Sequence, residues 1–165
     1  MPDFDVPDLT FKGVAIGEKE TPWTLLPLLY RGGPTVRANL VGAMIASGAL
    51  GPPLEDRLPL VVGLHSVIQG NLAGGSSKWS ELGAIDTIRR FFRWLDESHM
   101  SASLQEIEAV YLKWTDHLLH RVRTVKDISE IGAYVVASKL GRYLDRALER
   151  RKPILHQSSL RSQIG

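Results

Sequence analysis

Apolar residues recur at helical spacing in the second half of the chain, between polar positions that remain free to face water. The first such stretch covers about residues 78–97, and its apolar positions are separated by three or four residues. These positions are Ile85, Ile88, Phe91, Phe92 and Leu95. The pattern predicts an amphipathic helix with one buried stripe, and Ser77 directly before it is a suitable N-cap.

Two further stretches have the same character. Ser103 and Glu106 have the spacing of a capping box, which predicts a helix from there to about residue 122. Its apolar positions are Ile107, Val110, Tyr111, Trp114 and Leu118. Asp127 is the expected cap of a third helix over about 128–151, which ends before Pro153. Its core stripe is Ala133, Val136, Ala137, Leu140, Leu144 and Ala147. The three helices predict an all-α fold built as a small helical bundle.

The first part of the chain is less regular. Residues 9–16 predict one or two short strands, or extended chain laid on the body. Thr21-Pro22-Trp23-Thr24 predicts the start of a helix, which Pro27 keeps short. Helices are expected over about 35–47 and 58–72, and the Gly/Ser-rich run 73–77 is the best candidate for a hinge. We therefore expect a partly extended N-terminal region of uncertain role over 1–75, a helical domain over 76–152 and a linker or tail over 153–165.

Composition narrows the class of protein. The chain has 165 residues, of which 44% are hydrophobic and 23% charged, enough for one domain with a real core. There is no cysteine, which excludes disulfides and thiolate metal sites. The start is acidic where a signal peptide would be basic, and the longest apolar run, Leu58 to Leu64, is too short to cross a bilayer. We expect a cytoplasmic protein without membrane contact.

Charge is unevenly distributed along the chain. Residues 1–75 hold 5 Lys/Arg and 7 Asp/Glu, whereas residues 76–165 hold 15 and 11. The candidate DNA-binding residues are basic positions on the first and third helices of the bundle: Lys78, Arg89, Arg93, Lys139, Arg142, Arg146 and Arg150. Such a surface favours contact with a polyanion. An ordinary solvated face, partly neutralised by Asp145 and Glu149, explains the same pattern.

Two sequence segments carry a resemblance to a known family. The first is Arg89-Arg90-Phe91-Phe92-Arg93-Trp94-Leu95. The second is Leu104-Gln105-Glu106-Ile107, followed by Tyr111-Leu112-Lys113-Trp114. With the long basic helix that follows, residues 77–161 resemble the SAM-like core-binding domain of tyrosine recombinases, the phage integrase family.

The resemblance implies a module that binds double-stranded DNA during site-specific integration and recombination, and that self-associates on DNA through the full-length parent. In the family a separate C-terminal domain supplies the Tyr, Arg, Lys and His residues of catalysis. Only residues 154–165 follow the bundle here. We therefore expect a fragment that is not itself an enzyme and that needs no cofactor.

Other candidate chemistry is weaker. His120-Arg121-Val122-Arg123 matches the family's His-x-x-Arg box, but it falls inside the bundle and not after it. His117 and His120 have the spacing of metal ligands but no clear third partner, so no metal site is expected. The aromatic residues at helical spacing, Phe91, Phe92, Trp94 and Trp114, are expected in the core. The rival interpretation is a helical protein-interaction or regulatory domain that does not contact DNA.

Overall fold

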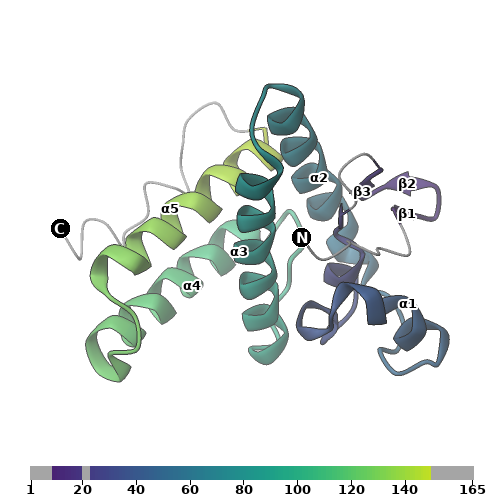
Figure 1. Cartoon of the computed structure of the whole chain (residues 1–165). Coiled ribbons are helices and arrows are strands. Elements are labelled where there is room, and N and C mark those ends of the chain that lie inside the picture. Colours follow the sequence, from purple (N-terminus) through teal and green to yellow (C-terminus); the bar gives the residue numbers. More distant parts are fainter. Residues whose placement is uncertain (1–8, 20–22, 150–165) are drawn as a thin grey trace.

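The computed structural model describes residues 9–19 and 23–149, and this part of the chain is mostly helical. It contains five α-helices: α1 (Ala38–Ala46), α2 (Leu58–Ala73), α3 (Lys78–Glu97), α4 (Ile107–His120) and α5 (Glu130–Ala147). Helix α3 lies at the centre, with α4 and α5 on one side and the N-terminal elements on the other (Figure 1). The predicted helical bundle is confirmed at this level. None of these helices is long and apolar enough to cross a membrane.

Helix α3 follows the sequence pattern closely. It begins directly after Ser77, whose hydroxyl accepts a hydrogen bond from the Ser80 amide at 3.1 Å. Its predicted apolar stripe is buried, with Phe91 and Phe92 fully inaccessible to solvent. Local signals and core packing agree here, which is why its bounds could be predicted from sequence.

The other two predicted caps are wrong. Helix α5 is capped by Ser129, which accepts a hydrogen bond from the Gly132 amide at 2.9 Å, and Asp127 pairs instead with Arg121. The cause is a wide π-helical turn, η4 (Arg121–Val125), that continues α4 and delays the start of α5.

Helix α4 has no side-chain cap, because the Ser103 hydroxyl bonds the Ser101 hydroxyl at 3.2 Å. The Ser103 amide also donates to Ser101, so local serine pairing replaces the expected capping box.

The N-terminal residues form two small antiparallel hairpins. Strand β1 (Thr10–Phe11) pairs with β2 (Val14–Ala15), which confirms the short strands predicted over 9–16. Lys12 and Gly13 turn the chain with φ of 49° and 81°, a left-handed pair that suits a tight hairpin. Strand β3 (Gly17–Glu18) pairs with β4 (Trp23–Thr24), so the helix start predicted over Thr21-Pro22-Trp23-Thr24 is wrong at Trp23 and Thr24, which are extended by this pairing. Thr21 and Pro22 lie outside the described residues.

A single hydrophobic core joins the N-terminal elements to the bundle. The 3₁₀ turn η1 (Leu26–Leu29) is buried, and its leucines belong to the same cluster as those of α2, α3, α4 and α5. Helix α2 contacts both α3 and α5. The expected boundary at residue 75 therefore does not divide two cores. The separate role expected for residues 1–75 stays a prediction.

The Gly/Ser-rich corner between α2 and α3 is closed by hydrogen bonds around Glu81, which is only 3% exposed. The Glu81 carboxylate accepts from Ser76 Oγ at 2.7 Å, from Asn71 Nδ2 at 3.1 Å and from the Tyr143 hydroxyl at 2.8 Å. This network ties α2, α3 and α5 together. Burial, followed by the hydrogen bond to Glu81, raises the pKa of Tyr143 to about 12.

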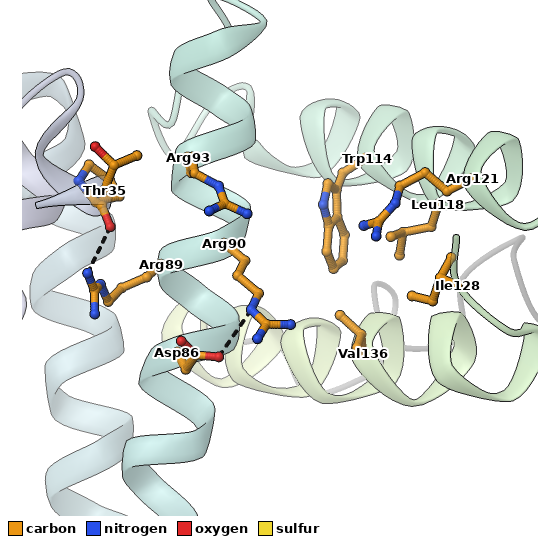
Figure 2. Close-up of a pocket in the computed structure, with 11 residues that line it drawn as sticks. Thr35, Asp86, Arg89, Arg90, Arg93, Trp114, Leu118, Arg121, Ile128 and Val136 are labelled. Atoms are coloured by element: carbon orange, nitrogen blue, oxygen red, sulfur yellow. Dashed lines mark hydrogen bonds and ion pairs between the residues drawn. The ribbon is translucent and has the colours of Figure 1, made fainter. Parts of the chain in front are cut away.

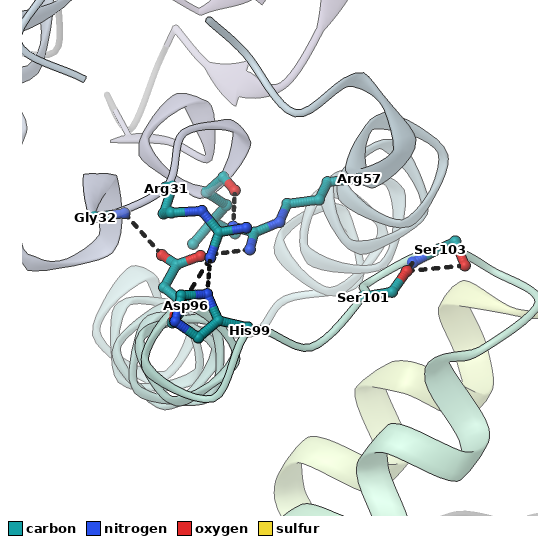
Figure 3. A network of polar contacts seen from close by, with 8 residues as sticks. Arg31, Gly32, Arg57, Asp96, His99, Ser101 and Ser103 are labelled. Atoms are coloured by element: carbon teal, nitrogen blue, oxygen red, sulfur yellow. Dashed lines mark hydrogen bonds and ion pairs between the residues drawn. The ribbon is translucent and has the colours of Figure 1, made fainter. Parts of the chain in front are cut away.

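A buried ion pair ties the other end of α3 to the N-terminal region (Figure 3). Arg57, in the 3₁₀ turn η3 (Glu55–Arg57), pairs with Asp96, and their side chains are 2% and 7% exposed. The second Asp96 oxygen accepts from the Gly32 amide at 2.9 Å, and Arg57 donates to the Leu28 carbonyl at 3.0 Å. Both charges are therefore satisfied by hydrogen bonds as well as by each other, as burial demands.

Replacing Asp96 by alanine should lower the free energy of unfolding by about 3 to 5 kcal/mol, because Arg57 is left as an uncompensated buried charge. Urea denaturation measures the change. Asp86→Ala is the matched control, since Asp86 forms an exposed i,i+4 pair with Arg90 that is worth about 0.5 kcal/mol or less. Equal losses in the two variants would contradict the role given to the buried pair.

Tyr143→Phe should change how stability depends on alkaline pH. Because the folded-state pKa of Tyr143 is raised, its contribution is fully present below about pH 10, the unfolded value, and declines as pH rises to about 12. The stability difference between the wild type and Tyr143→Phe should therefore shrink over that interval. Urea titrations at several pH values measure it, and a constant difference would show that the phenol proton is not held by the fold.

Candidate functional site

A groove of about 410 Å³ opens where α3, α4 and the start of α5 meet. Figure 2 shows arginine side chains from α3 facing Trp114, Leu118 and Arg121 across it. The full lining is Pro34, Thr35, Asp86, Arg89, Arg90, Arg93, Trp114, Leu118, Arg121, Ile128 and Val136. The groove thus combines an apolar floor with four guanidinium groups.

Helical geometry brings most of these charges to one side of α3. Asp86, Arg90 and Arg93 are separated by four and three residues, so they lie one above another on the helix surface. Arg121 is the first residue of the π turn after α4, and it lines the groove from the side opposite α3. Two separate elements therefore supply the positive charge.

The four arginines differ in how strongly they interact with other groups of the protein. Arg89 donates from one Nη atom to the Pro34 carbonyl at 2.9 Å and to the Val36 carbonyl at 3.1 Å, so it holds the chain around residues 34–36 against α3. Its buried Nε has no hydrogen-bond partner among the described residues. The Arg89 guanidinium is therefore used to stabilise the fold, and a ligand could bind it only by displacing these hydrogen bonds.

The other three arginines are more accessible to a ligand than Arg89. Arg90 pairs with Asp86 at 3.1 Å, and both side chains are more than half exposed. Arg121 pairs with Asp127 through Nε at 3.0 Å. Arg93 is exposed and has no hydrogen bond or ion pair within the described part of the chain. Exposed pairs of this kind are weak, so an incoming anion can compete with either aspartate.

His117 on α4 is near enough to Arg121 for the positive charge there to affect its pKa. The pKa of His117 is lowered, mainly by burial and then by the positive charges of Arg121 and His120, while Asp127 and Glu97 oppose the shift. Guanidinium groups offer paired N–H donors that match phosphate and carboxylate oxygens. The groove is therefore suited chemically to an anion with several oxygen atoms.

The structure places the predicted DNA-binding residues in different surroundings. Arg89 and Arg93 share the groove, and the Lys139 amine lies beside Gly83, where an added Cβ would be 3.7 Å from Nζ. Because Gly83 is one turn from Asp86, Lys139 extends the same side of α3.

Three other predicted residues, Lys78, Arg142 and Arg146, do not line the groove. Lys78 and Arg142 are exposed, and Arg146 donates to Asn71 Oδ1 at 2.6 Å. Arg150 lies outside the described residues.

Sequence reasoning missed Arg90 and Arg121. Arg90 has a signal, since its helical spacing to Arg93 and Asp86 places all three on one side. Arg121 has a signal as well, since it follows Trp114 and Leu118 by seven and three residues and so shares their side of the predicted helix; only its placement opposite Arg93 depends on tertiary packing. Phe91, Phe92 and Trp114 are buried, as expected for core aromatics, whereas Trp94 is only partly buried against the core. No group of three or more His, Asp or Glu in the described part of the chain is placed to hold a metal.

Arg89→Ala should destabilise the fold, because it leaves two carbonyl groups without their donor; the expected loss is about 1 to 3 kcal/mol. Arg93→Ala removes the same charge from an exposed position and should stay within about 0.5 kcal/mol of the wild type. Thermal or urea unfolding measures both. If the two variants lose equal stability, Arg89 does not anchor residues 34–36.

No family model, curated protein or solved structure matches this chain. The resemblance to recombinase core-binding domains therefore rests on the residues quoted from the sequence.

Proposed function

We propose that this chain binds double-stranded DNA through its phosphate backbone, with the arginine groove and the adjoining Lys139 as the contact surface. The observation that carries the proposal is the convergence of Arg90, Arg93 and Arg121, from two elements, on one open groove. Arginine pairs bidentately with phosphate oxygens, and exposed basic side chains release counterions from DNA when they bind.

The length of the basic surface supports a strand as ligand. From Gly83, where Lys139 lies, to Arg93 is ten residues of helix, or about 15 Å at the usual rise. One DNA strand advances about 3.4 Å per phosphate along the axis, so this distance faces several consecutive phosphates. Contacts of this kind position the protein on DNA and carry little sequence information.

The aspartates in and beside the groove set its affinity. Asp86 and Asp127 each hold one arginine in place through an exposed or half-exposed pair. A phosphate that displaces one of these aspartates forms an ion pair with the arginine. The negative charge of the aspartate stays close by and repels the phosphate. We therefore infer moderate, strongly salt-dependent binding.

On the family resemblance, we propose that the module is the core-binding part of a site-specific tyrosine recombinase that acts in DNA integration. In this proposal strand exchange belongs to a separate catalytic domain, and self-association on DNA occurs through the full-length parent. The motif that carries the resemblance forms the second half of α3, whose exposed side bears Arg90 and Arg93.

One observation favours the rival function, a protein-interaction domain. Ile131 and Val135 lie one turn apart on α5 and are 78% and 54% exposed, and Val125 in the π turn is 55% exposed. Exposed apolar groups at helical spacing suit a protein partner. DNA binding that is absent at low salt would favour this alternative.

Fluorescence anisotropy with duplex DNA at about 50 and 200 mM salt tests the proposal. The double variant Arg93→Glu/Lys139→Glu should lose most of the low-salt affinity and lower the slope of log K against log salt by about 2. Lys12→Glu/Lys19→Glu is the matched control, since it makes the same charge change on the N-terminal hairpins and should bind nearly as the wild type. Equal losses in both variants would show that net charge, and not the groove, governs binding.

A further inference from the structure

Trp79 is the most exposed large hydrophobic residue on the central helix α3. It is the second residue of α3 and is 60% exposed, whereas Trp23 and Trp114 are 2% and 4% exposed. Tryptophan is usually well buried, because its large apolar surface gains much from leaving water. Because Trp79 is exposed, a ligand that covers its ring would gain the free energy of burying this apolar surface.

Trp79 also lies at one end of the basic side of α3. At 100° per residue, the positions Trp79, Gly83, Asp86, Arg90 and Arg93 fall within an arc of roughly 80°, and together they span about 21 Å. The Lys139 amine lies over this side at Gly83. An exposed aromatic ring is thus followed along α3 by Arg90 and Arg93, with Lys139 of α5 lying between the ring and these arginines.

The immediate surroundings of the ring suit an aromatic ligand with negative charge. Lys78 Nζ lies 5.6 Å from the centroid of the Trp79 ring, a cation–π distance. No ring contact of Trp79 with another aromatic side chain occurs among the described residues. The indole is therefore accompanied by a cation but not covered by the protein core.

A nucleic acid strand matches both features, because its bases are aromatic and its phosphates repeat along it. Within a duplex the bases are stacked on each other and cannot reach a surface tryptophan. An unpaired base can stack on an exposed aromatic ring while neighbouring phosphates follow a basic surface. The order of groups on α3 therefore favours DNA that has both paired and unpaired parts.

We propose that Trp79 stacks on an unpaired base beside the duplex, so that the preferred ligand is duplex DNA with a single-stranded extension. The phosphates of the strand lie along Lys139, Arg90 and Arg93. This inference rests on the proposed DNA binding and deepens it by naming the DNA structure that is preferred.

The test compares a blunt duplex with the same duplex carrying a short single-stranded extension, by fluorescence anisotropy at one salt concentration. The wild type should bind the extended DNA at least about fivefold more tightly, the lower bound for stacking one base. Trp79→Ala should abolish that preference and leave blunt-duplex affinity within about twofold. Trp79→Phe should retain part of it. Leu112→Ala, which truncates an exposed apolar residue on α4, is the control and should keep the full preference.

The outcomes separate this inference from the function on which it rests. Blunt-duplex binding without any preference, or a preference that survives Trp79→Ala, overturns the role of Trp79 but not DNA binding. No binding to either DNA overturns both. Sedimentation velocity of the wild type and Trp79→Ala gives a further check: a change in mass would show that Trp79 serves self-association, which also overturns the stacking proposal.

Discussion

The buried pair of Arg57 and Asp96 is the interaction on which the arrangement of the molecule depends. It joins the end of α3 to η3, and Asp96 also fixes the chain at Gly32. Pro34 and Thr35, which follow, line one side of the groove, and Arg89 holds this segment by its hydrogen bonds to the Pro34 and Val36 carbonyls. The buried ion pair thus helps to position the groove, in which Arg90 and Arg93 remain exposed to solvent.

Helix α3 performs several tasks with different parts of one surface. Phe91 and Phe92 occupy the core, Asp96 anchors its end and Glu81 closes its start against α2 and α5. The side that remains carries Arg90 and Arg93 toward solvent. The buried phenylalanines, Asp96 and Glu81 fix the rotation of α3 about its axis. They therefore also determine the direction in which Arg90 and Arg93 point.

The proposed function rests on a distinction between arginines that stabilise the fold and arginines that remain available. Arg57 and Arg89 are bound to protein oxygens, whereas Arg93 is exposed and Arg90 is held only by an exposed pair. Composition alone treats these residues as equal contributors to a basic surface. The structure divides them by hydrogen bonding and burial, which decide how much desolvation and competition an incoming phosphate must overcome.

The sequence by itself determined where the bundle helices lie, because hydrophobic periodicity is a property of neighbouring residues; α3, the one helix whose predicted cap is correct, begins and ends where its pattern predicts. It also indicated which half of the chain carries the positive charge. Tertiary structure decided the start of α5, through the π turn that moved the cap from Asp127 to Ser129. It also decided the groove, since Arg93 and Arg121 come from separate elements and line one groove only because those elements pack together. Contacts between residues distant in sequence depend on packing, and no local pattern encodes them.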